Sequence, residues 1–162
     1  MRPLPLFVVS AALFVFGVGF TVIGARDARR TASSATPPSA PANVATVKQL
    51  MAAVAAPTAQ AIFDSVQTNV TEKGTEEIFP RTDEEWAALA ANAAALAEVG
   101  NLMQDEGRAI DQGDWVTMSA AMTAAAKEAI AAAQKKDTEA VLSAGDTVNG
   151  TCDTCHARYR RE

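Results

Sequence analysis

Residues 114–136, DWVTMSAAMTAAAKEAIAAAQKK, decide the fold of this chain. Apolar side chains recur every three or four positions, which is the spacing of one helix face: Trp115, Met118, Met122, Ala126, Ala129, Ile130 and Ala133. Alanine has the highest helix propensity of all residues, and neither glycine nor proline interrupts the stretch. Asp114 suits the N-cap, and Lys135 and Lys136 suit the negative end of the helix dipole. We therefore predict one amphipathic helix here, with its apolar face in a core.

A similar pattern precedes it, over about residues 44–70. Apolar residues of one face again fall at helical spacing: Val47, Leu50, Met51, Val54, Ala61 and Ile62. Pro57 lies inside this stretch, and because proline lacks an N–H and its ring crowds the preceding turn, we expect the helix to bend or divide there. Residues 71–80, TEKGTEEIFP, contain a glycine and end in proline, so we predict that they form a loop.

Two more helices complete the prediction. One begins after Thr82, which forms a capping box with Glu85, and ends near residue 104. The other begins after Asp137, an N-cap residue, and its apolar face carries Val141, Ala144, Val148, Cys152, Cys155, His156 and Tyr159. Four amphipathic helices joined by short connections indicate an all-α, antiparallel four-helix bundle over residues 44–162.

The composition agrees with such a bundle. The chain has 162 residues, enough for one domain, and 36 of them are alanine, whereas aromatic residues make up only 6%. Strand-favouring runs are nearly absent after residue 25, which argues against a sandwich or a barrel. The net charge of −5 disfavours nucleic acid as a partner. A core lined by alanine is thin, so a bulky apolar group could usefully fill it.

The first 43 residues differ from the rest and form two further segments. Residues 1–30 carry a net charge of +3, which leaves −8 for the remainder. Within them, residues 6–25 contain no charge and would span about 30 Å as a helix, roughly the thickness of a bilayer core. This length favours an uncleaved transmembrane anchor over a cleaved signal peptide, which usually has a shorter apolar stretch. Residues 31–43 are rich in Ala, Ser, Thr and Pro and are predicted to form an extended tether.

Both cysteines and the only histidine of the chain lie within the five residues Cys152-Asp153-Thr154-Cys155-His156. The spacing C-x-x-C-H is that of a c-type haem attachment site, in which the two thiols form thioethers with the haem vinyl groups and the histidine binds the iron. On a helix, at about 100° per residue, the two cysteines and the histidine fall within an arc of roughly 100°. They can therefore all face one cofactor.

Three other interpretations of this motif are weaker. A structural zinc site needs four ligands, usually in two pairs, and the sequence supplies one pair and one histidine. A thioredoxin-type redox motif is expected in a βαβ setting, which the helical pattern does not provide. A disulfide between the two cysteines would close only a small loop and stabilise little. The predicted cofactor is therefore haem c, one per chain.

A C-x-x-C-H motif on the last of four helices, followed by Tyr159 and Arg160, resembles the class II c-type cytochromes, which include cytochrome c′ and its low-spin relatives. The resemblance covers about residues 44–162. It implies a haem c inside the bundle, with the first helix facing the open side of the iron. It also implies haem attachment outside the cytoplasm, so the domain would be periplasmic and the anchor would have its N-terminus inside. Members of this family often dimerise, so a homodimer is compatible with the resemblance.

The resemblance also implies roles for individual residues. In the low-spin members a methionine of the first helix is the sixth iron ligand, and Met51 is the only methionine of that helix here. A thioether ligand raises the reduction potential. In cytochrome c′ the iron is instead five-coordinate, and Leu50 or Val54 would then lie over an empty site that binds NO or CO. Tyr159 would pack near the haem edge, and Arg160 would pair with a propionate or modulate the histidine.

No nucleophile–base pair, phosphate-binding loop or paired carboxylate site stands out, so we expect a protein that is not an enzyme. The leading prediction is a membrane-tethered periplasmic electron carrier whose iron is bound by His156 and Met51 and whose partners are redox proteins. The alternatives are a five-coordinate, gas-binding haem protein and a haem-free helical module whose cysteines form a disulfide or a metal clip. The other methionines of the helical domain are interpreted as core residues: Met103, Met118 and Met122.

Overall fold

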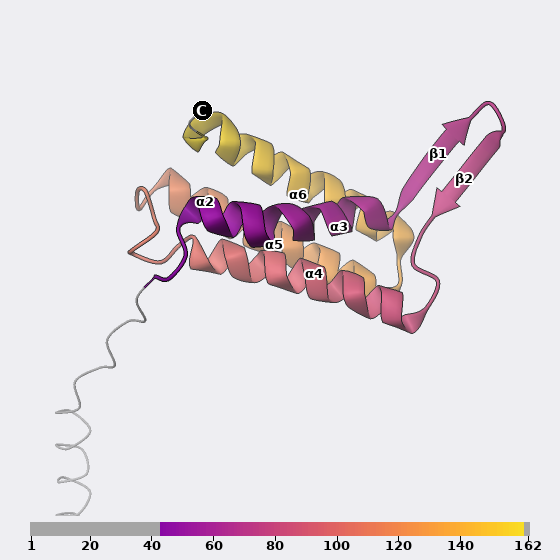
Figure 1. The fold of residues 1–162 in the computed structure, drawn as a ribbon, viewed down its shortest axis with the longest axis horizontal. Helices are drawn as coiled ribbons and strands as arrows, with labels where there is room; N and C mark the ends of the chain where they lie inside the picture. The colour runs from indigo at the N-terminus through magenta and orange to yellow at the C-terminus, as the bar shows by residue number, and fades with distance from the viewer. Residues whose placement is uncertain (1–42, 161–162) are drawn as a thin grey trace, which may run out of the picture. The chain divides into compact units, whose positions relative to one another are not determined.

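A computed structural model describes residues 43–160, which form the helical domain drawn in colour in Figure 1. Its elements, in chain order, are α2 (Val47–Leu50), the π-helix η1 (Met51–Ala55), α3 (Ala56–Ser65), β1 (Gln67–Thr71), β2 (Gly74–Ile78), α4 (Asp83–Leu102), α5 (Asp114–Lys135) and α6 (Thr138–Tyr159). The predicted anchor, residues 6–25, and nearly all of the tether, residues 31–43, lie outside the described residues. Within residues 43–160, no helix has the length and apolar character needed to cross a membrane.

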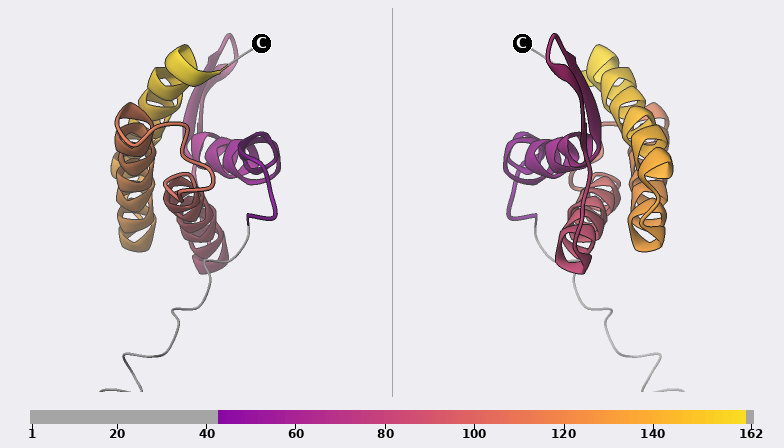
Figure 2. Two further views of the ribbon diagram at one scale, coloured as in Figure 1. Left: turned by 90° about the vertical axis from the view of Figure 1, so that its left-hand side faces the viewer. Right: turned by 90° about the vertical axis from the view of Figure 1, so that its right-hand side faces the viewer.

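Four helical rods form a bundle, as predicted. The first rod consists of α2, η1 and α3, which follow one another without a break, and the other three are α4, α5 and α6. α5 packs against both α4 and α6, and α3 also contacts both of these helices. The four rods therefore enclose one core (Figures 1 and 2). Pro57 interrupts the first rod as expected, and the form of the interruption is the single π-helical segment η1.

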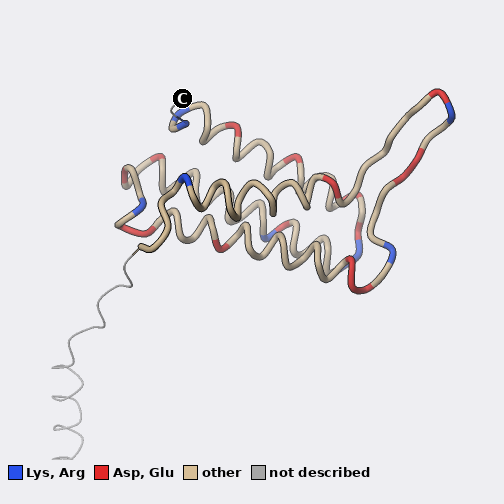
Figure 3. Tube along the Cα trace, viewed as in Figure 1, with Lys and Arg blue, Asp and Glu red and all other residues tan. Residues whose placement is uncertain are grey.

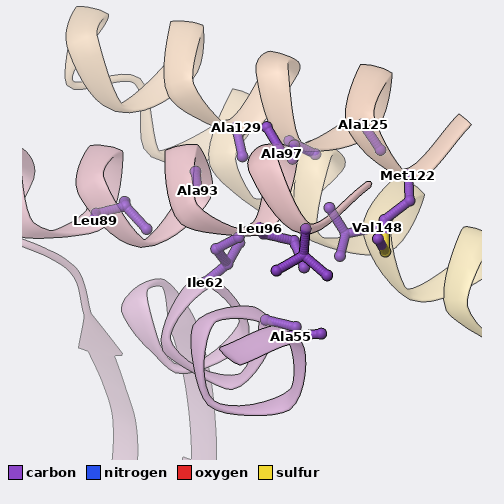
Figure 4. Close-up of a cluster of buried hydrophobic side chains, with 14 of the residues drawn as sticks. Ala55, Ile62, Leu89, Ala93, Leu96, Ala97, Met122, Ala125, Ala129 and Val148 are labelled. Atoms are coloured by element: carbon purple, nitrogen blue, oxygen red, sulfur yellow. The ribbon is translucent and has the colours of Figure 1, made fainter. Parts of the chain in front are cut away.

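The core consists of many small side chains with a few large ones between them. The largest of the fully buried side chains are Ile62, Leu96, Met103, Val141 and Val148. The surfaces of α4 and α5 that face each other are mostly alanine, including Ala93, Ala97, Ala125 and Ala129 (Figure 4). Because a methyl group occupies little space, the two backbones approach closely, and this pair makes the most extensive contact in the bundle.

The segment between α3 and α4 differs from the prediction. A β-hairpin occupies residues 67–78, where the sequence predicted the end of a helix followed by a loop. β1 pairs antiparallel with β2, from Gln67 opposite Ile78 to Thr71 opposite Gly74. Every strand residue except Gln67 is exposed, and the hairpin extends away from the helices (Figure 1).

The hairpin was missed because neither of its faces is buried. A strand is recognised in sequence by alternating apolar and polar residues, and that alternation arises only where one face packs on a core. α3 ends at Ser65, and the backbone of the next residue, Val66, is extended with φ −137° and ψ 118°. Val66 and Pro80 are both buried, so the two ends of the hairpin are fixed to the bundle even though its strands are not.

Two predicted N-caps are confirmed and one is wrong. Thr82 and Glu85 form the expected capping box at the start of α4. Asp137 caps α6 through its side chain. At α5, however, Gly113 is the N-cap and Asp114 is already the first helical residue, because a carboxylate from the preceding loop accepts the hydrogen bonds of the first turn instead.

The close approach of α4 and α5 can be tested at Gly100. A Cβ atom there would lie 2.2 Å from Oγ1 of Thr123 and 3.0 Å from the carbonyl oxygen of Ser119. We expect Gly100→Ala to lower the free energy of unfolding by about 1–3 kcal/mol, because the added methyl group overpacks the interface. Chemical denaturation measures this change.

The matched control is Gly150→Ala in α6, because no atom lies within 4 Å of a Cβ built there. Replacing an exposed helical glycine is expected to raise stability by up to about 1 kcal/mol. If both variants changed stability in the same direction, the close packing at Gly100 would be refuted.

Candidate functional site

The residues singled out by the sequence meet at one cavity of about 120 Å³ that is bounded by all four rods. Its lining consists of Met51, Ala55, Ala56 and Ala59 from the first rod, Leu96 and Met103 from α4 and its C-cap, Trp115, Met118, Ser119 and Met122 from α5, and Thr151, Cys152, Cys155 and His156 from α6. Every Cys, Met and His side chain within residues 43–160 is among them. Two other grooves on the domain contain none of these residue types.

The wall formed by α6 carries the C-x-x-C-H motif. Cys152, Cys155 and His156 lie on consecutive turns of the helix and all line the cavity, as the helical spacing predicted. The two cysteines are half-buried and not joined in a disulfide, and His156 is exposed at the mouth of the cavity. Burial raises the pKa of each of the two thiols above the ordinary value of a cysteine. The nearby carboxylate of Asp153 raises the pKa of Cys152 further. The thiols are therefore protonated at neutral pH.

The opposite wall is formed by η1 and the start of α3. Met51, the first residue of η1, is half-buried and lines the cavity. Leu50 and Val54, the residues expected over a five-coordinate iron, do not line it. Leu50 is instead buried in the hydrophobic core. Of the candidates on the first rod, the structure therefore brings only Met51 to the motif.

The other methionines of the domain have a second role besides filling the core. Met103 and Met122 are buried and Met118 is half-buried, which agrees with their interpretation as core residues. All three also face the cavity, so they form part of its surface. The sequence could not indicate this, because a methionine that faces a cavity and one that faces a closed core have the same helical spacing.

The cavity is almost entirely apolar. No Asp, Glu, Lys or Arg lines it. The charged residues of the domain are spread over the loops, the hairpin and the helices (Figure 3), and nearly all of them are exposed. Of its few polar side chains, Thr151 already donates a hydrogen bond to the Val148 carbonyl oxygen at 2.7 Å. The cavity therefore has an apolar wall on which sulfur and imidazole groups are the main reactive side chains.

A hydrogen-bonded group of side chains closes the end of the bundle beside the cavity. The Tyr159 hydroxyl, one turn after the motif, donates to the Asp111 carboxylate. The rings of Tyr159 and Trp115 pack edge to face, with centroids 5.0 Å apart. The indole N–H of Trp115 in turn donates to the Met103 carbonyl oxygen at 2.7 Å. Tyr159 does not line the cavity, but it contacts Trp115, which does, and it holds the end of α6 to the loop before α5.

Asp111 is the residue that the sequence analysis missed. Its Oδ1 atom accepts hydrogen bonds from the N–H groups of Gly113 and Trp115, at 2.9 and 3.1 Å, and its other oxygen accepts the Tyr159 hydroxyl. An aspartate just before a helix indicates an N-cap, and Asp111 fits that pattern. Asp114, three residues later, fits it equally well, so the sequence did not distinguish the two.

Arg160 does not line the cavity. It follows the last residue of α6 and is exposed. The neighbouring Arg158 forms an ion pair with Asp114, and its guanidinium lies 5.5 Å from the centre of the Tyr159 ring. Arg158 therefore contacts α5 and Tyr159 rather than the cavity itself.

Comparison of the chain with models of protein families, with curated proteins and with solved structures finds no match.

Because of the hydrogen bond between Asp111 and Tyr159, we expect the free energy of unfolding to depend on pH in the acid range. The Tyr159 hydroxyl and the Trp115 N–H hold the pKa of Asp111 below its ordinary value of 3.8. The unfolded chain therefore binds this proton more tightly than the folded chain, so the stabilisation is complete above that value and is lost as the pH falls through the folded-state pKa.

We expect the unfolding midpoint of the unmodified protein to fall between about pH 5 and pH 2 more steeply than that of Asp111→Asn, which has no such carboxylate. Thermal unfolding followed by circular dichroism across this range measures both curves. Parallel curves would show that the Asp111 carboxylate does not contribute in this way.

Proposed function

We propose that this chain is an electron-transfer protein of the class II c-type cytochrome kind, with one covalently attached haem c. Cys152 and Cys155 would hold the haem through thioethers, and His156 and Met51 would be the protein ligands of its iron. A haem iron supplies one-electron transfer by alternating between Fe(III) and Fe(II). The observation that carries the proposal is that Met51, on the first rod, lines the same cavity as the three motif residues on α6.

The packing of α6 supports this assignment. Its buried residues are Val141, Ala144, Gly145 and Val148, all in the first half of the helix. The second half carries the motif and has no buried residue, although it faces the apolar cavity. A domain in water is more stable when an apolar surface of this kind is covered. A covalently held porphyrin would cover the cavity side of α6.

The cavity wall also fits a porphyrin chemically. The small side chains of Ala55, Ala56 and Ala59 leave room along η1 and α3, and no charged group opposes an apolar ring. Trp115 and the methionine sulfurs offer polarisable contacts of the kind that favour aromatic partners. A porphyrin is wider than the cavity, so its binding would require the second half of α6 to move away from η1. This half has no buried residue, and its end is held by the contacts of Tyr159 and Arg158 with α5 and the loop before it.

The chain's own residues would set the properties of the iron. A neutral imidazole and a thioether add no charge, and an apolar wall disfavours the more highly charged oxidised state. Both effects raise the reduction potential. His156 is exposed, so electrons would enter and leave on the α6 side, where redox partner proteins can approach.

We place the domain in the periplasm, held to the inner membrane by residues 6–25. This part of the proposal rests on the uncharged apolar run in the sequence and on the site of haem c attachment. With no residue other than the ligands aligned for acid–base or nucleophilic chemistry in the described cavity, we propose electron transfer rather than enzymatic turnover.

The covalent attachment is tested by expressing the full chain in a bacterium that matures c-type cytochromes and recording absorption after denaturation. We expect a haem spectrum that stays with the polypeptide. In the Cys152→Ala/Cys155→Ala double variant this spectrum should be lost, because no sulfur can bind the vinyl groups. Thr154→Ala, which changes an exposed residue between the two cysteines, is the control and should keep the haem.

If the denatured unmodified protein carries no haem absorption, both haem proposals fail. The haem-free interpretation, in which the two cysteines form a disulfide or bind a metal, would then be favoured.

The sixth ligand is tested by Met51→Ala in the haem-loaded protein. We expect the low-spin spectrum of the unmodified protein to become high-spin, the reduction potential to fall and CO to bind readily, because the thioether leaves the iron. Met118→Ala is the matched control, since Met118 lines the same cavity from α5 and should leave the spectrum low-spin. A high-spin unmodified protein that binds CO equally well with and without Met51 would favour the gas-binding alternative.

A further inference from the structure

The β-hairpin packs less against the rest of the domain than any helix does. Only Gln67 at its base is half-buried, and all the other residues of β1 and β2 are exposed. A two-stranded hairpin without a packed face is at best marginally stable in water. Within residues 43–160 the sheet consists of these two strands alone, so each strand has a free outer edge. A further strand added to one of these edges would stabilise the hairpin.

The turn of the hairpin determines which backbone groups point outward. A two-residue turn, residues 72–73, makes Thr71 and Gly74 the closing pair, whose backbone groups bond across the hairpin. Along an antiparallel strand, the backbone N–H and C=O groups of successive residues point alternately toward one neighbour and the other. Thr68 and Val70 therefore direct these groups away from β2. The outer edge of β1 thus offers two donors and two acceptors.

The two outer edges of the hairpin differ in charge. β1, with the sequence QTNVT, contains no charged residue, no proline and no glycine. β2, with the sequence GTEEI, carries Glu76 and Glu77, and the backbone of Glu77 is one of those that point outward. Natural proteins protect their edge strands from pairing with charged side chains, proline or bulges. The edge of β2 is protected by charge in this way, whereas the edge of β1 is not.

We propose that a second copy of this chain pairs with β1 edge to edge, so that the two hairpins form one antiparallel four-stranded sheet. With the two-fold axis at Asn69, the middle residue of β1, Thr68 of each copy lies opposite Val70 of the other. These two pairs form four hydrogen bonds and satisfy every outward N–H and C=O group of both strands. If Thr68 or Val70 instead lay opposite itself, only half of these bonds would form within β1.

The side chains of the hairpin suit a second copy as the partner. The two uncharged strands meet at the centre, and the two β2 strands with their glutamates lie about 14 Å apart at the outer edges, which is more than the screening length at physiological salt. Val70, which is 79% exposed in the single chain, would lie beside Thr68 of the second copy on the same face of the sheet. Because the contact is short, we expect a reversible dimer.

The register is tested by Asn69→Cys in the full chain. The two introduced thiols would face each other across the two-fold axis in a non-hydrogen-bonded pair, where Cα atoms are about 4.5 Å apart and a disulfide can form. Mild oxidation should give a dimer linked through position 69, which mass spectrometry of the linked peptides identifies. Glu76→Cys is the matched control, because Glu76 lies opposite Asn69 in the same hairpin but on the other edge. No link through position 69, or an equally strong link through position 76, would overturn the proposal.

The pairing itself is tested by Val70→Pro, with sedimentation of the purified full chain in detergent over a series of concentrations. Proline removes the outward N–H of this residue and no hydrogen bond to β2. Two of the four bonds between the copies are then lost, so self-association should weaken by about tenfold or more. Thr75→Pro, at the outward-pointing position opposite Val70, is the control and should keep the dimer.

A monomeric unmodified chain would overturn the proposed pairing, and so would the same effect on self-association in both proline variants. Neither measurement requires haem, because the pairing depends on the hairpin alone. A dimer linked through position 69 in a chain without haem would therefore refute the proposed electron-transfer function and support the pairing of the hairpins.

Discussion

The small size of alanine side chains controls how the helices of this bundle approach one another. Where α4 faces α5, alanines lie against each other and the backbones come close enough for Gly100 to be required opposite Thr123. Around the end of α6, alanines of the first rod face a helix half that has no buried residue. The same residue type that closes the core in one place therefore leaves an apolar cavity in the other.

This cavity is the place where the sulfur and imidazole groups of residues 43–160 meet. Four methionines, two cysteines and one histidine come from all four rods, yet all line this one space. In the proposed haem site, the two thiols, the imidazole and the Met51 thioether would be the groups that hold the cofactor.

The parts of this architecture that depend on local physics could be predicted from the sequence. The helical rods follow from apolar periodicity, and the starts of α4 and α6 follow from the side-chain caps at Thr82 and Asp137. The placement of Cys152, Cys155 and His156 on one face follows from helix geometry alone. Each of these features involves residues within a few positions of one another.

The parts that depend on distant contacts or on exposed surfaces could not be predicted. Asp111 and Tyr159 are 48 residues apart and meet only because α6 returns to the start of α5. The hairpin has no buried face, so its strands leave no apolar pattern. At Pro57 the sequence predicted an interruption, but whether the helix would kink, break or gain a residue was decided by packing and by the bond from Thr58 to Val54.

The central claim is that η1 and α6 are two walls of one haem site. Iron X-ray absorption spectroscopy of the purified full-length protein tests it most directly, because it identifies the atoms bound to the metal. The account predicts iron surrounded by the porphyrin and imidazole nitrogens together with one sulfur atom, and loss of that sulfur in Met51→Ala. Protein without iron, or iron whose surroundings are unchanged by Met51→Ala, would contradict it.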